Sequence, residues 1–229
     1  NIVVLSHDPV LNPDIVRRDG QWTGGPAIRS LMLNELRRYD IGRLNPASAY
    51  AAQFTQQKPA DGERFPTLAE LFALDPKVRL NIEIKTDPAK PDLTPTPEHF
   101  AALVVDVVRK ASAARRTTIQ SFDWRGLVAA KRLAPEIETS CLTIDRGGES
   151  TSVSRLASAK AAGCTIWSPF WRNLSTANLA EARALGLKVL PWTVNEPAEM
   201  ARLIDLKVDG LITDYPDRAL ALLRGKSLK

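Results

Sequence analysis

The sequence from residue 78 onward alternates between short apolar runs and amphipathic segments, and this alternation constrains the fold more than any other feature. The apolar runs have the length of buried strands, and the segments between them have the periodicity of helices. Strands that alternate with helices indicate a parallel sheet covered by helices, which is an α/β fold. We expect strands over Arg79–Lys85, Thr117–Ser121, Thr139–Ile144, Cys164–Ser168, Lys188–Val194 and Gly210–Thr213.

Capping residues or prolines mark the expected helix starts. The later helices are expected to begin at or directly after Pro97, Asp123, Ser175 and Pro197. The first third of the chain is less regular, and there Ser30 is expected to cap a short helix. Thr67 and Glu70 form a capping box at the start of another helix. The long polar stretch 45–63 between these two helices predicts a loop.

Two α/β architectures fit such an alternation. An open doubly wound sheet usually carries a glycine fingerprint after its first strand, and none is visible here. A (β/α)8 TIM-type barrel instead places polar residues at the carboxyl ends of its strands, as at Glu83, Gln120, Asn195 and Asp214. We therefore expect residues 1–229 to form a single barrel domain. Because six strand–helix units are visible where a barrel needs eight, its first one or two β/α units are expected to be absent from this sequence.

The sequence carries a net charge of +5, and its Lys and Arg residues occur as scattered doublets without a basic run. This charge pattern disfavours nucleic acid as a partner. No apolar stretch approaches the roughly 20 residues that span a bilayer, so no transmembrane segment is expected. The two cysteines, Cys141 and Cys164, exclude a disulfide-dense scaffold and a cysteine zinc cluster. Because both lie among apolar residues, we expect buried free thiols rather than a bridge.

The strand-like run LNIEIKT, residues 80–86, carries a carboxylate and an ammonium group on one face. Alternation places Ile82 and Ile84 toward the helices, whereas Asn81, Glu83 and Lys85 point to the barrel interior. Charges on an inward face are costly to bury without partners. Glu83 and Lys85 could form an internal salt bridge that closes a barrel layer. Equally, Glu83 could bind a metal beside a lysine that binds an anion.

Three further residues have competing interpretations. His7 follows the apolar run Ile2–Leu5, where a histidine could serve as a proton carrier at neutral pH or as a rim residue satisfied by hydrogen bonds. Trp192, at the end of another strand, could line a pocket or belong to the core. His99, the second of the two histidines, lies at a helix start and is expected to be a solvated surface residue.

The ordered motifs VVLSHDP, ERFPTLAELF, LNIEIKT, TIQSFDW, LKVLPWTVNEP and VDGLITDYPD resemble the glycerophosphodiester phosphodiesterase family over nearly the whole chain. The resemblance implies a (β/α)8 barrel of the phospholipase-C-like phosphodiesterase superfamily. It implies metal-dependent hydrolysis of glycerophosphodiesters, the small-molecule substrates, to an alcohol and glycerol 3-phosphate. It further implies two-histidine general acid/base catalysis with a divalent cation, Ca²⁺ or Mg²⁺.

The resemblance also implies roles for four residues. His7 would be one of the two catalytic histidines, and Glu83 would be a metal carboxylate. Lys85 would face the phosphate, and Trp192 would line the substrate pocket against the apolar side of the glycerol moiety. A cation and an ammonium group would neutralise the charge that builds up on the phosphodiester in the transition state.

Sequences of this family begin with a strand that carries a His-Arg-Gly motif, followed by a strand that carries a Glu-x-Asp motif and then by a His-Asp segment. This sequence starts at the His-Asp segment. We expect the natural molecule to carry roughly 50–60 residues before Asn1, with a further histidine and a Glu-x-Asp pair. Residues 1–229 alone are expected to aggregate or to complete their sheet with another chain. Many relatives with similar sequences are exported bacterial enzymes. The resemblance therefore favours a periplasmic or secreted location over a cytoplasmic one.

Two other functions compete with glycerophosphodiester hydrolysis. One is a phosphodiesterase of the same superfamily that acts on phospholipid or lysophospholipid head groups, since the loop 45–63 could shape either pocket. The other is a catalytically inactive barrel that binds phosphate ligands or a partner, because half of the family's site is not found in these residues. The sequence gives no indication of oligomeric state or head-group preference.

Overall fold

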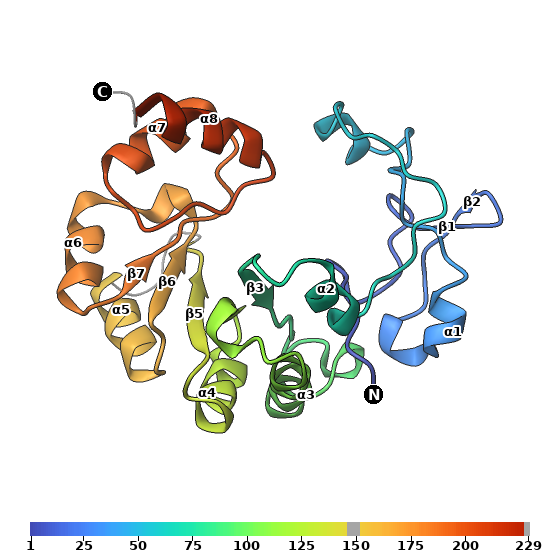
Figure 1. The fold of residues 1–229 in the computed structure, drawn as a ribbon, viewed down its shortest axis with the longest axis horizontal. Coiled ribbons are helices and arrows are strands. Elements are labelled where there is room, and N and C mark those ends of the chain that lie inside the picture. Colours follow the sequence, from blue (N-terminus) through green and yellow to red (C-terminus); the bar gives the residue numbers. More distant parts are fainter. Residues whose placement is uncertain (146–151, 227–229) are drawn as a thin grey trace. The chain divides into compact units, whose positions relative to one another are not determined.

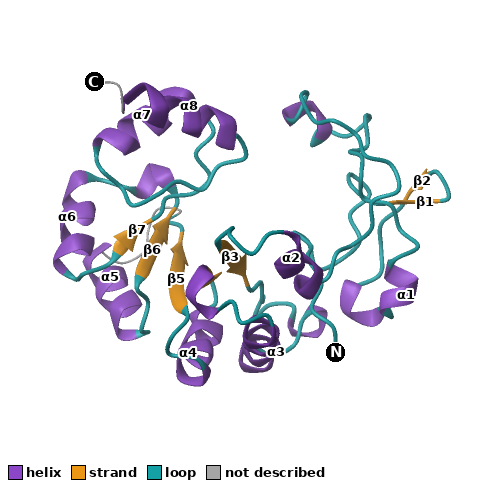
Figure 2. Ribbon diagram, viewed as in Figure 1, coloured by secondary structure: helices purple, strands orange, loops and turns teal. Residues whose placement is uncertain are grey.

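The computed structural model describes residues 1–145 and 152–226. The chain divides into two compact units (Figure 1). The first contains Asn1–Val78 and Lys85–Ala113, and the second contains Arg79–Ile84 and Ala114–Lys229. Helices and loops dominate the first unit, whereas the second unit contains the large sheet (Figure 2).

The second unit is built on a five-stranded sheet in which every neighbouring pair of strands is parallel. The strands lie side by side in their order along the chain. A doubly wound sheet would reverse its strand order at a switch point, so the sequential order supports barrel-type winding and confirms the α/β prediction. The strands are β3 (Leu80–Glu83), β4 (Thr117–Ser121), β5 (Glu138–Thr143), β6 (Ile166–Pro169) and β7 (Lys188–Val189).

Two of the predicted strands differ from the structure by more than two residues at an end. The strand expected over Lys188–Val194 ends at Val189, and Pro191 shortly after it has no N–H to donate to a ladder. The segment 210–213 is not a regular strand, although it runs beside this region. The Ile212 N–H donates to the Pro191 carbonyl at 3.0 Å, and the Val194 N–H donates to the Ile212 carbonyl at 2.9 Å.

Five α-helices accompany the sheet in the described part of the second unit, and capping side chains explain where two of them begin. The Asp123 carboxylate accepts the Arg125 N–H at 3.2 Å, and the Ser175 hydroxyl accepts the Asn178 N–H at 3.2 Å, as predicted. The helices are α4 (Trp124–Leu133), α5 (Ser152–Ala161), α6 (Thr176–Ala184), α7 (Pro197–Asp205) and α8 (Pro216–Lys226), and 3-10 helices cover Ala114–Arg116 and Trp171–Asn173.

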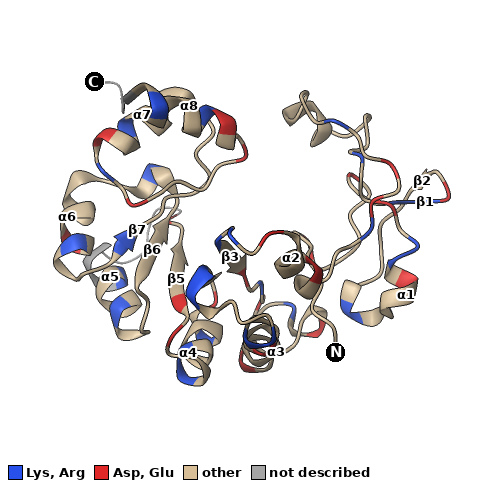
Figure 3. Ribbon diagram, viewed as in Figure 1, with Lys and Arg blue, Asp and Glu red and all other residues tan. Residues whose placement is uncertain are grey.

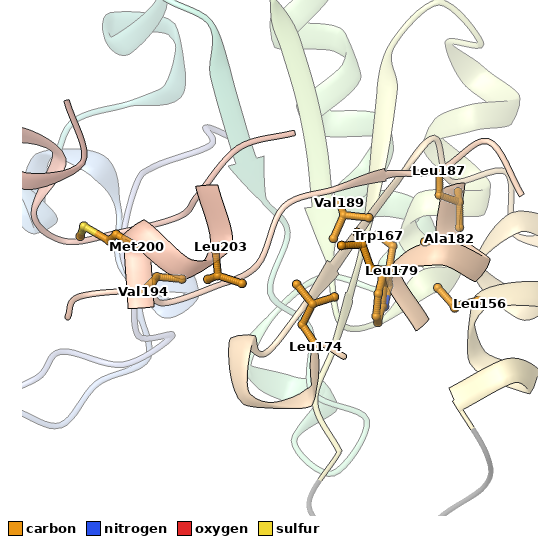
Figure 4. Packing of buried hydrophobic residues seen from close by; sticks show 10 residues of the cluster. All are labelled: Leu156, Trp167, Leu174, Leu179, Ala182, Leu187, Val189, Val194, Met200 and Leu203. Carbon is orange, nitrogen blue, oxygen red and sulfur yellow. The ribbon is translucent and has the colours of Figure 1, made fainter. Parts of the chain in front are cut away.

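The helices pack on the sheet through a buried apolar cluster (Figure 4). Trp167 of β6 and Val189 of β7 lie beside Leu179 of α6 in this cluster, which also contains Leu156 of α5. The Trp167 indole N–H donates to the Thr143 hydroxyl at 2.9 Å, so burial leaves this polar atom satisfied. This cluster fixes the helices against one face of the sheet and leaves the other face for polar side chains.

A disulfide joins Cys141 to Cys164, with Cα atoms 6.0 Å apart, so the expectation of free thiols is wrong. Cys141 lies in β5, and Cys164 lies just before the neighbouring strand β6. Both residues are buried. Apolar surroundings are compatible with either state, and only the pairing of the two strands brings the sulfur atoms together.

The first unit contains a two-stranded antiparallel hairpin and short helices. Its strands are β1 (Arg17–Arg18) and β2 (Gln21–Trp22), its α-helices are α1 (Leu33–Leu36), α2 (Leu68–Leu74) and α3 (Pro97–Lys110), and its 3-10 helices cover Ile28–Ser30, Ala51–Gln53 and Pro91–Leu93. The capping box of Thr67 and Glu70 is confirmed, with the Glu70 N–H 3.1 Å from the Thr67 hydroxyl. Ser30 caps no helix: its hydroxyl donates to the Ala27 carbonyl at 2.7 Å at the end of a 3-10 helix. The predicted loop 45–63 contains a single 3-10 turn.

A network of charges organises the loops of the first unit. The Arg17 guanidinium lies 2.7 Å from carboxylate oxygens of both Asp40 and Asp61. Burial raises the pKa of Asp40, but the N–H groups of Gly42 and Gly62 together with Arg17 outweigh it and lower the pKa to about 2. Across the described residues Lys and Arg are interspersed with Asp and Glu along the chain (Figure 3). No helix in the described part of the chain is long and apolar enough to cross a membrane.

We predict that the double variant Cys141→Ala/Cys164→Ala loses about 3 kcal/mol in the free energy of unfolding. The disulfide spans a sequence separation of 23 residues, and closing a loop of this size restricts the unfolded chain by about that amount. Urea denaturation measures the difference. Adding a reductant is the control, because it should destabilise the wild type and leave the variant unchanged. Two titratable thiols in unreduced, unfolded wild-type protein would contradict the bridge.

Candidate active site

One face of the sheet in the second unit carries polar side chains that bond to one another. The Asn81 amide of β3 donates to the Gln120 side-chain carbonyl of β4 at 2.8 Å. Ser140 of β5 and Ser168 of β6 share a hydrogen bond of 3.1 Å. Ile82, by contrast, is buried on the opposite face, which confirms the predicted alternation along β3.

Glu83 ends β3 at the carboxyl edge of this polar face. It lies opposite Gln120 in the register of β3 and β4, and it is half-buried. The strand expected over Arg79–Lys85 therefore ends two residues early, so Lys85 follows the strand and belongs to the first unit. Both interpretations of Glu83, as a salt-bridge partner of Lys85 and as a metal ligand, stay predictions.

His7 is an exposed side chain of the first unit whose ring is oriented by the next residue. The preceding run forms an isolated antiparallel bridge between Val4 and Thr67 rather than a full strand. The ring Nδ1 of His7 lies 3.0 Å from Oδ1 of Asp8, and the Asn12 amide donates to Oδ2 of the same carboxylate at 2.8 Å. A carboxylate only accepts hydrogen bonds, so Nδ1 carries the proton and Nε2 is left as the basic nitrogen.

Asp8 is held in its charged form by these neighbours. Burial raises its pKa, but hydrogen bonds from Asn12 and His7 and the positive charge of Lys85 outweigh burial and place the pKa below its ordinary value. The carboxylate therefore remains an acceptor for the His7 ring at neutral pH. Lys85 and His7 thus both interact electrostatically with the Asp8 carboxylate.

Trp192 lies at the carboxyl end of the sheet in the second unit and is fixed on several sides. Its indole N–H donates to the Ser168 carbonyl at 2.9 Å, and its backbone pairs with Phe170 in a parallel bridge. The ring centroid lies 5.3 Å from that of Phe122 and 5.4 Å from that of Phe170. Trp192 is only partly buried, and Phe122 remains 47% exposed. Together these three aromatic side chains form an apolar surface at the rim.

The residues present do not by themselves form a complete divalent-cation site. Ca²⁺ takes six to eight oxygen ligands and Mg²⁺ takes six. Residues 1–145 and 152–226 contain no group of three or more His, Cys, Asp or Glu side chains that could hold a metal ion. Glu83 offers one carboxylate, which is a fraction of the oxygen ligands that either ion needs.

The structure places two of the four predicted site residues in each unit. His7 and Lys85 belong to the first unit, and Glu83 and Trp192 belong to the second. Two residues were missed. Asp8 could have been found from the sequence, since a carboxylate directly after a candidate catalytic histidine is a natural orienting group. Phe122 is an aromatic residue just after a strand end, but its contact with Trp192 depends on strand pairing. His99 is exposed on α3, as expected.

The parallel sheet, with its strands in sequential order and polar side chains at their carboxyl ends, defines a class of fold, the barrel-type α/β proteins. Comparison with known proteins then identifies the family within this class. The family model of the glycerophosphoryl diester phosphodiesterase family matches residues 1–218. The chain belongs to this family, and it is a phosphoric diester hydrolase.

Individual relatives agree with the family. A glycerophosphodiester phosphodiesterase of Caldanaerobacter subterraneus is 27% identical over 97% of this chain and 80% of its own length. A crystal structure from Silicibacter pomeroyi is 31% identical, with a TM-score of 0.86 over 99% of this chain and 80% of that one. The fold is also shared by an Oleispira antarctica phosphodiesterase in complex with its product sn-glycerol-3-phosphate, at 23% identity and a TM-score of 0.74 over 97% of this chain and 80% of that one.

We predict that Asp8→Asn abolishes the preference of His7 for one tautomer. An amide can present either its oxygen or its NH₂ group to Nδ1, so the constraint imposed by the carboxylate is lost. Long-range ¹H–¹⁵N NMR of the neutral imidazole should show the Nδ1–H form in the wild type and a mixture in the variant. Asn12→Ala is the control, since it keeps the carboxylate next to the ring. Identical tautomers in wild type and Asp8→Asn would contradict the orienting role.

Proposed function

We propose that this protein hydrolyses glycerophosphodiesters to an alcohol and glycerol 3-phosphate. The observation that supports this most is the family match over residues 1–218, which includes the oriented pair His7–Asp8. A phosphodiester is anionic and repels nucleophiles, so its hydrolysis requires proton transfer and neutralisation of charge at the phosphate. The chain offers a group for each task.

His7 is proposed as one of the two general acid/base histidines. Its ring is exposed to an incoming substrate, and Nε2 is free to take the proton of the attacking oxygen or, when protonated, to give one to the leaving alkoxide. Asp8 keeps Nδ1 protonated and stabilises the imidazolium formed when Nε2 takes a proton. Without that carboxylate, a share of the rings would present the wrong nitrogen.

Lys85 is proposed to hold the phosphate through its charge. An ammonium group is a compact point charge on a flexible stem, which suits a phosphate whose oxygens shift during the reaction. The positive charge of Lys85 lowers the pKa of Asp8, the residue next to His7. This effect supports the proposed role, because it means that the charge of Lys85 acts close to His7. In this position it would lower the energy of a transition state with more negative charge than the substrate.

Glu83 is proposed to supply one carboxylate to a divalent cation, either Ca²⁺ or Mg²⁺. A half-buried carboxylate at the end of β3 is a hard oxygen donor of the kind these ions prefer. The cation would supply further neutralisation of the phosphate charge. The remaining ligands of such an ion are not assigned to this chain.

Trp192 is proposed to contact the apolar side of the glycerol moiety. The hydrogen bond of its indole to Ser168 and its ring contacts with Phe122 and Phe170 limit its motion. A large flat side chain fixed in this way can orient the carbon skeleton of a small polar substrate at little entropic cost. Phe122 would extend the same surface because it is partly exposed.

The test is a direct assay of the full-length protein on glycerophosphocholine with Ca²⁺ or Mg²⁺. Glycerol 3-phosphate release can be followed by coupling it to a dehydrogenase. Faster hydrolysis of lysophosphatidylcholine would favour the lysophospholipid head-group reaction instead. If neither substrate is hydrolysed while glycerol 3-phosphate binds, the chain is an inactive phosphate-binding barrel and the proposal is wrong.

We predict that His7→Ala lowers kcat at least about 10²-fold, because a general acid/base residue contributes roughly 10²–10⁴-fold. The midpoint of thermal unfolding should be unchanged, since the His7 side chain is 77% exposed. His99→Ala is the matched control: the same replacement at an exposed histidine on α3 should leave turnover intact. A folded His7→Ala protein with wild-type kcat would refute the assignment.

The two charged residues after Ile82 are predicted to respond differently to neutral replacements of similar size. Glu83→Gln should weaken Ca²⁺ binding in a calorimetric titration, because an amide oxygen is a poorer ligand for a hard cation than a carboxylate. Lys85→Met should leave that affinity unchanged and lower kcat about 10²-fold, as expected for loss of one charge-stabilising group. Unchanged Ca²⁺ affinity in Glu83→Gln would return this residue to a structural role.

A further inference from the structure

Asn195 and Asp214 form a compact hydrogen-bonded link between two successive connections at the carboxyl end of the sheet. The Asn195 side-chain carbonyl accepts the Asp214 N–H at 3.0 Å and the Thr213 hydroxyl at 3.2 Å. Its NH₂ group donates to Oδ2 of Asp214 at 2.8 Å. The Asn195 backbone carbonyl also accepts from the Arg218 guanidinium at 3.2 Å. The Asn195 amide thus provides the hydrogen-bond partners at the end of the segment 210–213.

The chemistry of this link requires an amide at residue 195. The same side chain must accept from two donors and also donate to a carboxylate, and of the small side chains only Asn does both in this geometry. Aspartate there would place two carboxylates in contact, and alanine would leave the Asp214 N–H without its acceptor. The arrangement is therefore specific, although Asn195 is outside the set of residues to which a role in the reaction was assigned.

The link lies three residues after Trp192 on a short and well-bonded stretch of chain. Between them, the Val194 N–H donates to the Ile212 carbonyl at 2.9 Å. Trp192 is bonded on its other side to β6, through the Ser168 carbonyl and through the Pro169 carbonyl, which accepts the Trp192 N–H at 3.1 Å. The backbone on both sides of Trp192 is thus bonded to Ile212, and its indole is bonded to Ser168 of β6.

We propose that Asn195 is a positioning residue that fixes Trp192, and with it the binding of the glycerol moiety, through its link to Asp214. The inference rests on the proposed function for its effect on substrate, while its effect on Trp192 stands on the hydrogen bonds alone. It deepens that function by assigning the orientation of the substrate-binding indole to a residue that does not itself touch substrate.

The experiment exchanges the two side chains. Asn195→Asp should raise KM for glycerophosphocholine about fivefold, the effect of losing one hydrogen bond, with kcat changed less than twofold. Asn195→Asp/Asp214→Asn should return KM to near the wild-type value, because a carboxylate at 195 accepts the same donors and an amide at 214 supplies the missing NH₂. Asp214→Asn alone keeps an acceptor for Asn195 and should raise KM less than twofold.

A spectroscopic readout on ligand-free protein makes the test independent of turnover. In protein labelled with 5-fluorotryptophan, the ¹⁹F resonance of Trp192, assigned through Trp192→Phe, should shift or broaden in Asn195→Asp and recover in the exchanged double variant. Asn178→Asp is the matched control. It changes another doubly bonded amide, at the start of α6, and should lower the unfolding midpoint without moving that resonance.

Three results would overturn the inference. One is a Trp192 resonance that does not move in Asn195→Asp. If that variant does not fold, the milder Thr213→Val takes its place, because it removes one of the three hydrogen bonds of the Asn195 side chain. The second is failure of the exchanged variant to restore the signal. The third is an equal rise of KM when Asn195→Asp is made in a Trp192→Ala background, since an effect that acts through Trp192 must vanish there. Absence of turnover with a rescued resonance would instead refute the proposed function alone.

Discussion

The pairing of polar side chains on the inner face of the parallel sheet is the constraint on which the second unit depends. Buried hydroxyl and amide groups are tolerated only when they are hydrogen-bonded. The buried Gln120 meets this requirement through Asn81 of the neighbouring strand, and the buried Ser140 and Ser168 meet it through each other. These bonds need one strand register, and the same register sends Ile82 and Trp167 to the helix-packed face. The polar carboxyl edge of the sheet is a result of this division between two faces.

Local signals in the sequence predicted much of the fold. The capping residues Thr67, Asp123 and Ser175 each begin the helix expected after them, because a cap acts on amides only two or three residues away. Ser30 has the right residue type and fails, since the chain there closes a 3-10 turn instead. Strand ends were less predictable, as β7 shows, because the extent of a ladder depends on neighbours that are distant in sequence.

The same distinction holds for the candidate site. His7 and Asp8 are adjacent in the sequence, so their hydrogen bond requires only a local turn, and the sequence contains the information for it. The contact of Phe122 with Trp192 requires β4 and β7 to be placed in one sheet, and a single sequence does not specify that placement. For the same reason the disulfide was missed: the apolar neighbours of Cys141 say that it is buried, not what lies opposite.

That disulfide has a consequence for how the molecule can diversify. It joins β5 to the start of β6 across a separation of 23 residues, so the alignment of these strands does not rest entirely on the chain that connects them. Substitutions and length changes in that connection should therefore lower the free energy of unfolding less than equivalent changes in the other connections between neighbouring strands. Because such bonds persist where the surroundings are oxidising, a relative that loses the cysteine pair would need stronger packing of α5 to tolerate the same variation.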